Sequence, residues 1–341
     1  MIEGRFKGLP KSLRPKPSKE VPTSVTEEFI RWCRSLGLKA VAWLPVLRFD
    51  EAVRNDSSIA TVDAWGSLGD YKRLFMCPSN PYVRSFIKLL TEDLITKYDF
   101  DEVELDYIRY PKPPITYAPP HTLISMLTCF CKYCRERMRE VGIDPDELIS
   151  SIRRLGSWVR DLINEVPTFS NDTDYLIATY NDLAWRVIRD DLISKWLEFR
   201  CELIAEVVSM IKDVIKSYSP NTQLSADLYP PSSSWLLGQD YRLLSKYLSR
   251  VKLMLYTSPF NVSPHRIPFE ASLAKELVSG GTEVIIGLAG WPPTTEAILK
   301  RDVELVLRSG VDGAYLYSFG WCPKPILSLF PKLVRGDDLG S

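Results

Sequence analysis

The sequence has 341 residues, of which 45% are hydrophobic and 11% aromatic, enough for a sizeable core in one large domain or two modest ones. Its 43 Lys and Arg residues balance 43 Asp and Glu residues. Because nucleic-acid binding depends on an excess or a stripe of basic charge, this balance argues against nucleic acid as the main partner.

Membrane and secretion signals are not recognisable in the sequence. No apolar run approaches the roughly 20 residues that span a bilayer, and residues 1–10 lack the apolar segment of a signal peptide. Seven cysteines are an odd number for a disulfide framework, which a chain of this length does not need. We therefore expect a soluble, cytoplasmic protein without a membrane partner.

The N-terminal third begins with an arm rich in Lys and Pro at residues 1–24, expected to be extended over the surface or partly disordered. A helix is predicted at 25–36 and a buried strand at 39–47. Loop-like sequence follows at 48–80. A second helix is predicted at 81–98, and it leads into a strand that ends near Asp106.

The remainder alternates strands with helices after a long helical region. Residues 112–218 form a mostly helical insertion with a long final helix. Further strands are predicted at 223–229, 251–258, 283–288 and 313–319, with helices between them at 239–249, 268–279 and 294–309. The pattern predicts an α/β fold, a (β/α)8-type TIM barrel over 25–335 with the insertion after the fourth strand, and a short tail at 336–341.

The strand count falls short of a closed barrel. The pattern contains six clear strands, whereas this class of barrel has eight. Either two short strands lie in 1–24 or 59–80, or the N-terminal βαβ unit is absent or reduced, and we favour the second interpretation. An open edge needs cover, and the arm or a second subunit in a homo-oligomer could supply it.

The strand at 101–107 alternates apolar and acidic residues, and strand side chains point to opposite faces with a period of two. Val103, Leu105 and Tyr107 are expected to face the helices, while Glu104 and Asp106 point into the barrel. Carboxylates at the C-terminal ends of barrel strands are typically catalytic. The alternative is a structural ion pair with one of three cations: Arg48, Arg109 or Lys252.

Asp227 occupies the equivalent place on the next strand, where Ser225 and Tyr229 share its face. Two carboxylates at neighbouring strand ends suit cleavage of a glycosidic bond, since one protonates the leaving oxygen and the other attacks the sugar or activates water. The alternative is that Asp227 only orients Arg109 or Tyr256. Lys252, on the strand after that, is placed to neutralise Glu104.

Aromatic side chains cluster near the predicted strand ends. Indole and phenol rings stack on the apolar faces of sugars, so several at one rim indicate a saccharide-binding surface, although a single one more often belongs to the core. The candidate substrate-binding residues are Trp43, Arg48, Tyr256, Trp291, Tyr317 and Trp321.

Metal and cofactor sites have weaker support. Cys129, Cys131 and Cys134 have spacings that allow metal binding, but a closed zinc site needs a fourth ligand. Cys77, Cys201 or His121 would supply it only by folding nearby, and buried thiols or one disulfide are the alternatives. With two histidines in the chain and no Gly-rich phosphate loop, we predict no metal and no cofactor.

The sequence Phe-Asp-Glu-Val-Glu-Leu-Asp-Tyr-Ile-Arg-Tyr-Pro at 100–111 resembles the LDYIRYP-type signature of glycoside-hydrolase-like TIM-barrel proteins, distant relatives of α-amylase and α-galactosidase barrels. The resemblance implies that Asp106 is the nucleophile and, less directly, that Asp227 is the acid/base. Two features depart from the family: Glu102 replaces a glycine, and the N-terminal strands are not recognisable. Supporting matches occur at 77–81, 129–134, 196–200, 225–227 and 310–318.

These observations favour an enzyme, a glycoside hydrolase acting on an oligosaccharide or polysaccharide. Asp106 and Asp227 are the predicted catalytic pair, and Glu104 and Arg109 are predicted to tune or position Asp106. Two alternatives remain open at this point. One is a non-catalytic carbohydrate-binding protein on a degenerate barrel, and the other is a lyase or aldolase that uses Lys252 as a Schiff-base lysine.

Overall fold

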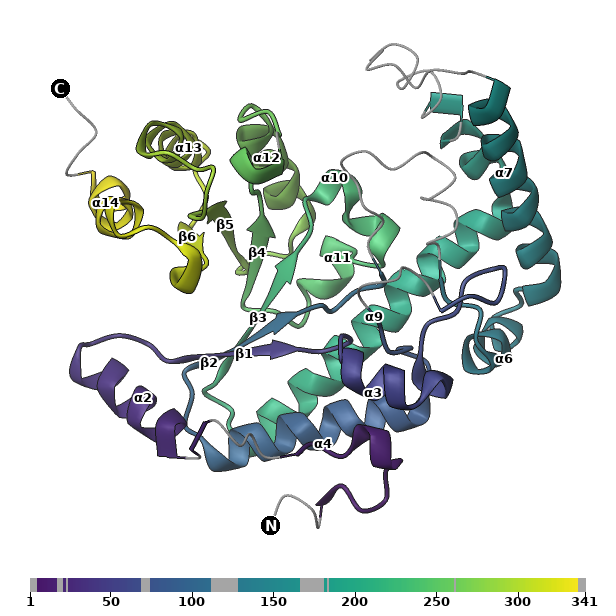
Figure 1. Cartoon of the computed structure of the whole chain (residues 1–341), viewed down its shortest axis with the longest axis horizontal. Helices are drawn as coiled ribbons and strands as arrows, with labels where there is room; N and C mark the ends of the chain where they lie inside the picture. Colours follow the sequence, from purple (N-terminus) through teal and green to yellow (C-terminus); the bar gives the residue numbers. More distant parts are fainter. Residues whose placement is uncertain are drawn as a thin grey trace.

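The computed structural model describes residues 5–16, 21–22, 24–68, 74–111, 128–165, 181–182, 184–260 and 262–336. Six parallel strands form one sheet in chain order. Figure 1 shows the sheet curled, with helices around its convex side. The strands are β1 (Val41–Pro45), β2 (Glu102–Asp106), β3 (Gln223–Leu228), β4 (Arg250–Met254), β5 (Glu283–Ala289) and β6 (Gly313–Tyr317).

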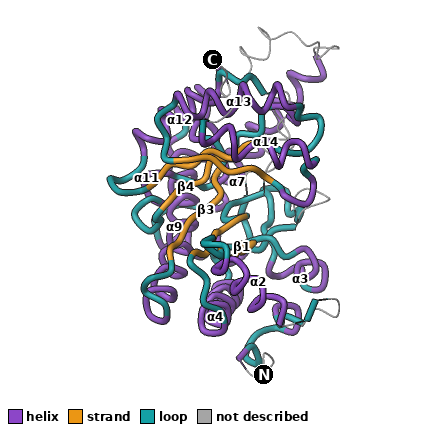
Figure 2. The backbone as a smooth tube through the Cα atoms, turned by 90° about the vertical axis from the view of Figure 1, so that its left-hand side faces the viewer, coloured by secondary structure: helices purple, strands orange, loops and turns teal. Residues whose placement is uncertain are grey.

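Helices connect successive strands and cover the sheet from outside, as Figure 2 shows from the side. The two helices α4 and α9 pack against each other next to the first three strands. The helices are α2 (Ser24–Ser35), α3 (Asp50–Asn55), α4 (Pro81–Lys97), α6 (Lys132–Glu140), α7 (Pro145–Glu165), α9 (Asp191–Tyr218), α10 (Pro231–Ser234), α11 (Tyr241–Leu244), α12 (Arg266–Leu277), α13 (Glu296–Arg308) and α14 (Lys324–Arg335).

The alternation of side chains places an apolar face of the sheet against the helices. Val103 and Leu105 of β2 are fully buried in the same core as Leu224, Leu228 and Leu253 of the next two strands. This arrangement buries apolar surface, the main favourable term in folding. It also leaves the acidic and basic residues of β2, β3 and β4 on the concave face.

The strand positions agree with the prediction, and the sheet is an incomplete TIM-type barrel. In the described parts of 1–24 and 59–80 there is no strand; two isolated antiparallel bridges, Arg48 to Phe75 and Ala60 to Met76, occur in the loops after β1. An eight-stranded barrel is therefore not formed by the residues that the structure describes. On the β1 edge, the side chain of Trp43 is 50% exposed.

Part of the N-terminal arm differs from expectation because it belongs to the core. Phe6, Leu9 and Leu13 are each no more than 5% exposed, and the short 3-10 helix η1 (Lys11–Leu13) contacts α3 and α4. The prediction of an extended or disordered arm was therefore wrong for residues 5–16.

The region between β2 and β3 is helical, as predicted, in the part that the structure describes. Its long helix α9 begins later than expected, at Asp191, because the Asp190 side chain caps it by accepting hydrogen bonds from the N–H groups of Leu192 and Ile193. The helix predicted at 239–249 is reduced to Tyr241–Leu244. Within the described residues, no helix has the length and apolar character needed to cross a membrane.

Candidate active site

Three carboxylates of β2 lie on the concave face of the sheet. Glu102, Glu104 and Asp106 alternate with the buried apolar residues Val103 and Leu105, so they share one side of the strand. The sequence analysis included the second and third of these acids and missed Glu102. The same period of two could have identified it.

The two glutamates are neutralised by cations of β4. Glu102, only 1% exposed, forms ion pairs with Arg250 and, at 3.3 Å, with Lys252, and it accepts a hydrogen bond from the Ser225 hydroxyl. Lys252 also pairs with Glu104, as the sequence predicted. Each of the two glutamates therefore has a cation beside it, which offsets the cost of taking its charge out of water.

Asp106 lies one pleat further along, where β2 ends. The N–H of Tyr107 donates a hydrogen bond of 2.6 Å to its Oδ1 atom. Burial raises the pKa of Asp106, while that hydrogen bond and the nearby guanidinium of Arg109 act in the opposite direction. Asp106 thus has one hydrogen-bond donor and one nearby cation that favour its charged form, while its burial favours the protonated form.

Tyr107 does not face the helices, and this prediction was wrong. Its φ of 52° is in the left-handed region, which ends the strand alternation at Asp106. The ring instead lines the cavity above Asp106, and its hydroxyl accepts a hydrogen bond of 2.7 Å from Arg48. Arg48 is in turn held by an ion pair with Asp50 at 3.0 Å.

Arg109 is buried among aromatic rings. Its guanidinium carbon lies 5.0 Å from the ring centroid of Phe75 and 5.1 Å from those of Tyr107 and Tyr229. Cation–π contacts of this kind hold a guanidinium in place without neutralising its positive charge, as a carboxylate would. The side chain can therefore act electrostatically on Asp106, as its effect on the pKa of that residue shows.

Asp227 is held more firmly in the protonated form. Burial is the main reason that its pKa lies well above the usual value, and the negative charges of Glu104 and Asp106 add to the effect. The hydroxyl of Tyr315 donates a hydrogen bond of 2.9 Å to Asp227 Oδ1. The charge of Asp106 therefore acts on Asp227 across neighbouring strand ends, in the direction that favours the protonated form of Asp227.

The sequence analysis missed Tyr315 as a site residue. It lies two residues before Tyr317 on β6, so the same strand period places both on the concave face. Its ring passes directly over Gly287 of β5, where an added Cβ atom would lie 2.2 Å from the Tyr315 Cζ atom. Gly287 thus leaves the space through which Tyr315 reaches Asp227.

Gln239 is a third residue that the sequence analysis missed. It is fully buried, its amide nitrogen lies 3.2 Å from the Ile108 carbonyl oxygen, and its Oε1 accepts a hydrogen bond of 2.9 Å from the Tyr229 N–H. These bonds connect the chain just beyond Asp106 to the chain just beyond Asp227. Gln239 therefore holds the two strand ends together.

The two aspartates line a cavity of about 290 Å³, close to the lower end of the usual size range of ligand pockets. Much of its wall is aromatic: the rings of Tyr256 and Trp291 are 5.1 Å apart, and those of Tyr256 and Tyr317 are stacked at 5.7 Å. The cavity is lined by Asp106, Tyr107, Arg109, Asp227, Tyr229, Pro230, Ser233, Met254, Leu255, Tyr256, Phe260, Val262, Arg266, Trp291, Tyr317 and Trp321.

Most of the candidate residues from the sequence lie around this cavity, but three do not line it. Glu104 lies beneath it, paired with Lys252. Arg48 reaches it only through the hydroxyl of Tyr107, and the Trp43 ring lies 6.4 Å from that of Tyr107. The structure thus groups the candidates in space, and their individual roles stay predictions.

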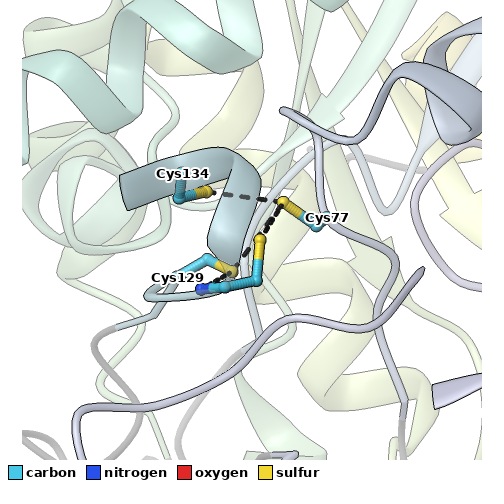
Figure 3. A group of neighbouring side chains, drawn as sticks. Cys77, Cys129 and Cys134 are labelled. Atoms are coloured by element: carbon cyan, nitrogen blue, oxygen red, sulfur yellow. Dashed lines mark hydrogen bonds between the residues drawn. The ribbon is translucent and has the colours of Figure 1, made fainter. Parts of the chain in front are cut away.

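The cysteines form a second group, on the loops behind the cavity. Cys77 lies beside the three cysteines of 129–134, and the four sulfurs are all within 4.8 Å of one another. Figure 3 shows the sulfurs of Cys77, Cys129 and Cys134 close together. Cys201 lies elsewhere, against the Trp235 carbonyl oxygen at 3.9 Å, and His121 is outside the described residues.

Comparison with known proteins supports the fold. No protein-family profile matches the sequence, and no curated protein matches it at the sequence level. The structure resembles the PgaB (BpsB) glycoside hydrolase domain from Bordetella bronchiseptica, with a TM-score of 0.62 and 14% identity over 95% of this chain and 82% of that one. It also resembles the catalytic domain of β-amylase from Paenibacillus polymyxa, with a TM-score of 0.59 and 12% identity over 94% and 88% of the two chains.

A third similar structure is the GH42 β-galactosidase Gan42B from G. stearothermophilus, with a TM-score of 0.59 and 12% identity over 94% of this chain and 50% of that one. At these identities the likeness concerns the fold. The chain has a glycoside-hydrolase-like fold built on an incomplete TIM-type barrel.

Proposed function

We propose that this protein is a glycoside hydrolase in which Asp106 and Asp227 form the catalytic pair. The observation that supports it most directly is the position of the two acids and the difference between their pKa shifts. They lie at neighbouring strand ends in an aromatic cavity, and their environments differ, so that Asp227 holds its proton more strongly. A pair of carboxyl groups with different proton affinities is what acid-assisted glycoside cleavage requires.

Each acid then has a distinct task. Asp227 donates its proton to the glycosidic oxygen as the bond to the sugar breaks. Asp106, stabilised as a carboxylate by Arg109 and the Tyr107 N–H, either attacks the anomeric carbon or takes a proton from an attacking water. A carboxyl separation of about 5–5.5 Å corresponds to the first route, with retention, and one of about 6.5–9.5 Å to the second, with inversion.

The aromatic wall supports a carbohydrate ligand. Trp291, Tyr317 and Trp321 contact one another edge to face, with ring centroids 5.8 to 6.5 Å apart, and Trp321 is 65% exposed. Rings fixed in this way offer apolar surface to a sugar at little cost in side-chain entropy. The substrates to test first are those of two similar enzymes described above, the β-galactosidase and the β-amylase.

The lyase or aldolase hypothesis receives less support. A Schiff-base lysine must be free to attack a carbonyl group, but Lys252 is paired with both Glu102 and Glu104 and does not line the cavity. The hypothesis of a non-catalytic carbohydrate-binding protein is compatible with the same cavity. The two hypotheses differ in one measurable respect: a hydrolase loses activity when Asp106 is replaced, whereas a carbohydrate-binding protein keeps its affinity for the glycan.

The test is a screen of aryl glycosides, oligosaccharides and polysaccharides against the wild type, Asp106→Asn and Asp227→Asn. As a control, Asp99→Asn removes an acid whose side chain is 79% exposed. For a substrate that the wild type cleaves, we expect each cavity variant to lose at least about 10³-fold in kcat/KM and the control to retain activity. The configuration of the first product, followed by NMR, then distinguishes retention from inversion.

Two results would reject the proposal. Hydrolysis that survives both cavity substitutions would exclude these acids as the catalytic pair. Binding of a glycan that the wild type never cleaves, with the same affinity in Asp106→Asn, would favour the carbohydrate-binding protein.

A further inference from the structure

The four clustered cysteine sulfurs lie at separations suited to a single metal ion. The Sγ atom of Cys77 is 3.3 Å from that of Cys131, 3.4 Å from that of Cys134 and 3.8 Å from that of Cys129. A tetrahedral zinc ion with four Zn–S bonds of about 2.3 Å places its sulfurs about 3.8 Å apart. All four cysteines are free thiols, and all except Cys131 are buried.

The backbone around the group directs hydrogen-bond donors at the sulfurs. The N–H groups of Val62 and Cys131 both point at Cys129 Sγ, each at 3.4 Å. The Ser79 hydroxyl oxygen lies 3.3 Å from Cys134 Sγ. Second-shell hydrogen bonds of this kind orient the ligands of protein metal sites.

A buried cation next to the group is an independent indication of negative charge. Arg200 is 1% exposed, and its Nε atom donates to the carbonyl oxygen of Thr128, the residue before Cys129. Its Nη1 atom donates to the Leu236 carbonyl oxygen at 3.0 Å, and its guanidinium lies 4.3 Å from the centroid of the Tyr110 ring. Neither contact supplies a negative charge: among the described residues Arg200 has no ion pair with a carboxylate, and its Nη2 atom lacks a hydrogen-bond partner. A buried cation is costly unless a negative charge compensates it. Four thiolates around a divalent ion carry such a charge, whereas four neutral thiols do not.

We propose that Cys77, Cys129, Cys131 and Cys134 bind one structural Zn²⁺ ion. On binding, each thiol releases its proton to solvent and its sulfur coordinates the metal. With four protein ligands and no open position, the site is of the closed structural type. A four-iron cluster fits less well, because its thiolates bind four separate iron atoms and so lie further apart.

The zinc site connects two segments that follow neighbouring strands. Cys77 belongs to the loop sequence after β1, and the other three ligands precede or begin α6, after β2. Cys77 is two residues from Phe75, whose ring contacts the guanidinium of Arg109 in the candidate active site. The ion therefore anchors the segment that carries Phe75, which packs against Arg109, without taking part in the reaction.

The full-length protein, purified without added metal, tests this proposal by elemental analysis. We expect about one zinc ion per chain, released by about four equivalents of a mercurial reagent. Replacement of zinc by Co²⁺ should produce the strong visible bands and thiolate-to-cobalt charge-transfer band of a tetrahedral four-thiolate site. The apo protein should melt at a lower temperature than the zinc form.

Matched variants locate the site. Cys77→Ser and Cys134→Ser should lose most of the zinc, whereas Cys201→Ser, which changes a buried thiol outside the group, should retain it. If the cluster variants do not fold, the cobalt spectrum and the mercurial titration of the wild type still decide. Purified protein without zinc that binds no Co²⁺ through thiolates, or protein that contains iron in its place, would overturn the proposal.

Discussion

Two layers of acidic residues on the same concave face differ in how their negative charge is compensated. In the lower layer, Glu102 and Glu104 are paired with Arg250 and Lys252. In the upper layer, Asp106 and Asp227 have hydrogen-bond donors, and Arg109 acts on Asp106, but both acids have raised pKa values. Under the proposed function, the lower layer contributes stability and the upper layer contains the catalytic pair. Burial alone does not make this distinction, since Glu102 of the lower layer is the most buried of the four.

The largest effect on stability is expected from removing the buried negative charge of Glu102 in the lower layer. Glu102→Gln leaves Arg250 and Lys252 with one partner each, Glu283 and Glu104. Because the lost charge is buried, the free energy of unfolding in urea should fall by about 3 kcal/mol. The control Glu283→Gln, which removes an acid that is 47% exposed, should cost less than about 1 kcal/mol. Equal losses in the two variants would show that burial of the pair is unimportant.

A smaller loss of stability is expected when the space that Gly287 leaves for the Tyr315 ring is filled. Gly287→Ala places a Cβ atom 2.2 Å from the Tyr315 Cζ atom, so the ring must move away from Asp227. We expect a loss of about 2 kcal/mol in the free energy of unfolding, together with reduced hydrolysis. Gly280→Ala meets no atom within 4 Å and serves as the control, with a change within about 0.5 kcal/mol. A Gly287→Ala variant as stable as this control would contradict the close contact.

Replacing Asp227, which titrates, by a group that does not titrate should change stability in the opposite direction. The folded-state pKa of Asp227 is raised, so the wild type loses stability as the pH rises from the ordinary aspartate pKa of about 4 toward the folded-state value. Asp227→Asn does not titrate in that window. It should therefore be more stable than the wild type at neutral pH, by about 1 kcal/mol, and equally stable below about pH 4. A gap in unfolding free energy that does not change with pH would reject the raised pKa.

The smallest effect is expected from Tyr315→Phe, which removes the hydrogen bond to Asp227. Because this hydrogen bond lowers the pKa of Asp227, its loss should raise that pKa further. The acid then stays protonated to higher pH, so the alkaline limb of the kcat/KM profile should move upward, with about a two-fold change in the maximal rate. Tyr82→Phe, on the outer helix α4, should leave the limb in place. A limb that moves downward would show that Asp227 is not the acid.

The period-two pattern predicted much of the site. The alternation in β2 and β3 placed Glu104, Asp106 and Asp227 on the concave face, and the ion pair between Lys252 and Glu104 is present. The same rule failed at Tyr107, where a φ of 52° ends the alternation. A left-handed residue is not visible in a strand pattern when the residue is neither Gly nor Asn.

The cysteine group shows a different limit. Three of its members lie within six residues of sequence, at 129–134, and were recognised as weak metal candidates. The fourth, Cys77, lies 52 residues before Cys129. Spacing along the chain does not report which loops meet in space. In the structure, the backbone hydrogen bonds from Met76 N–H to the Leu47 carbonyl and from Phe130 N–H to the Val62 carbonyl bring the loops together.

The sequence by itself determined the order of strands and helices, the faces of the strands and the positions of the two aspartates, because these depend on local periodicity. Only the tertiary structure decided which acids have cations beside them, that Tyr315 reaches Asp227 and that Cys77 joins the other cysteines. Those relations depend on distances between side chains remote in the sequence. They follow from how the sheet curls and how the loops pack at its edge, which no local pattern encodes.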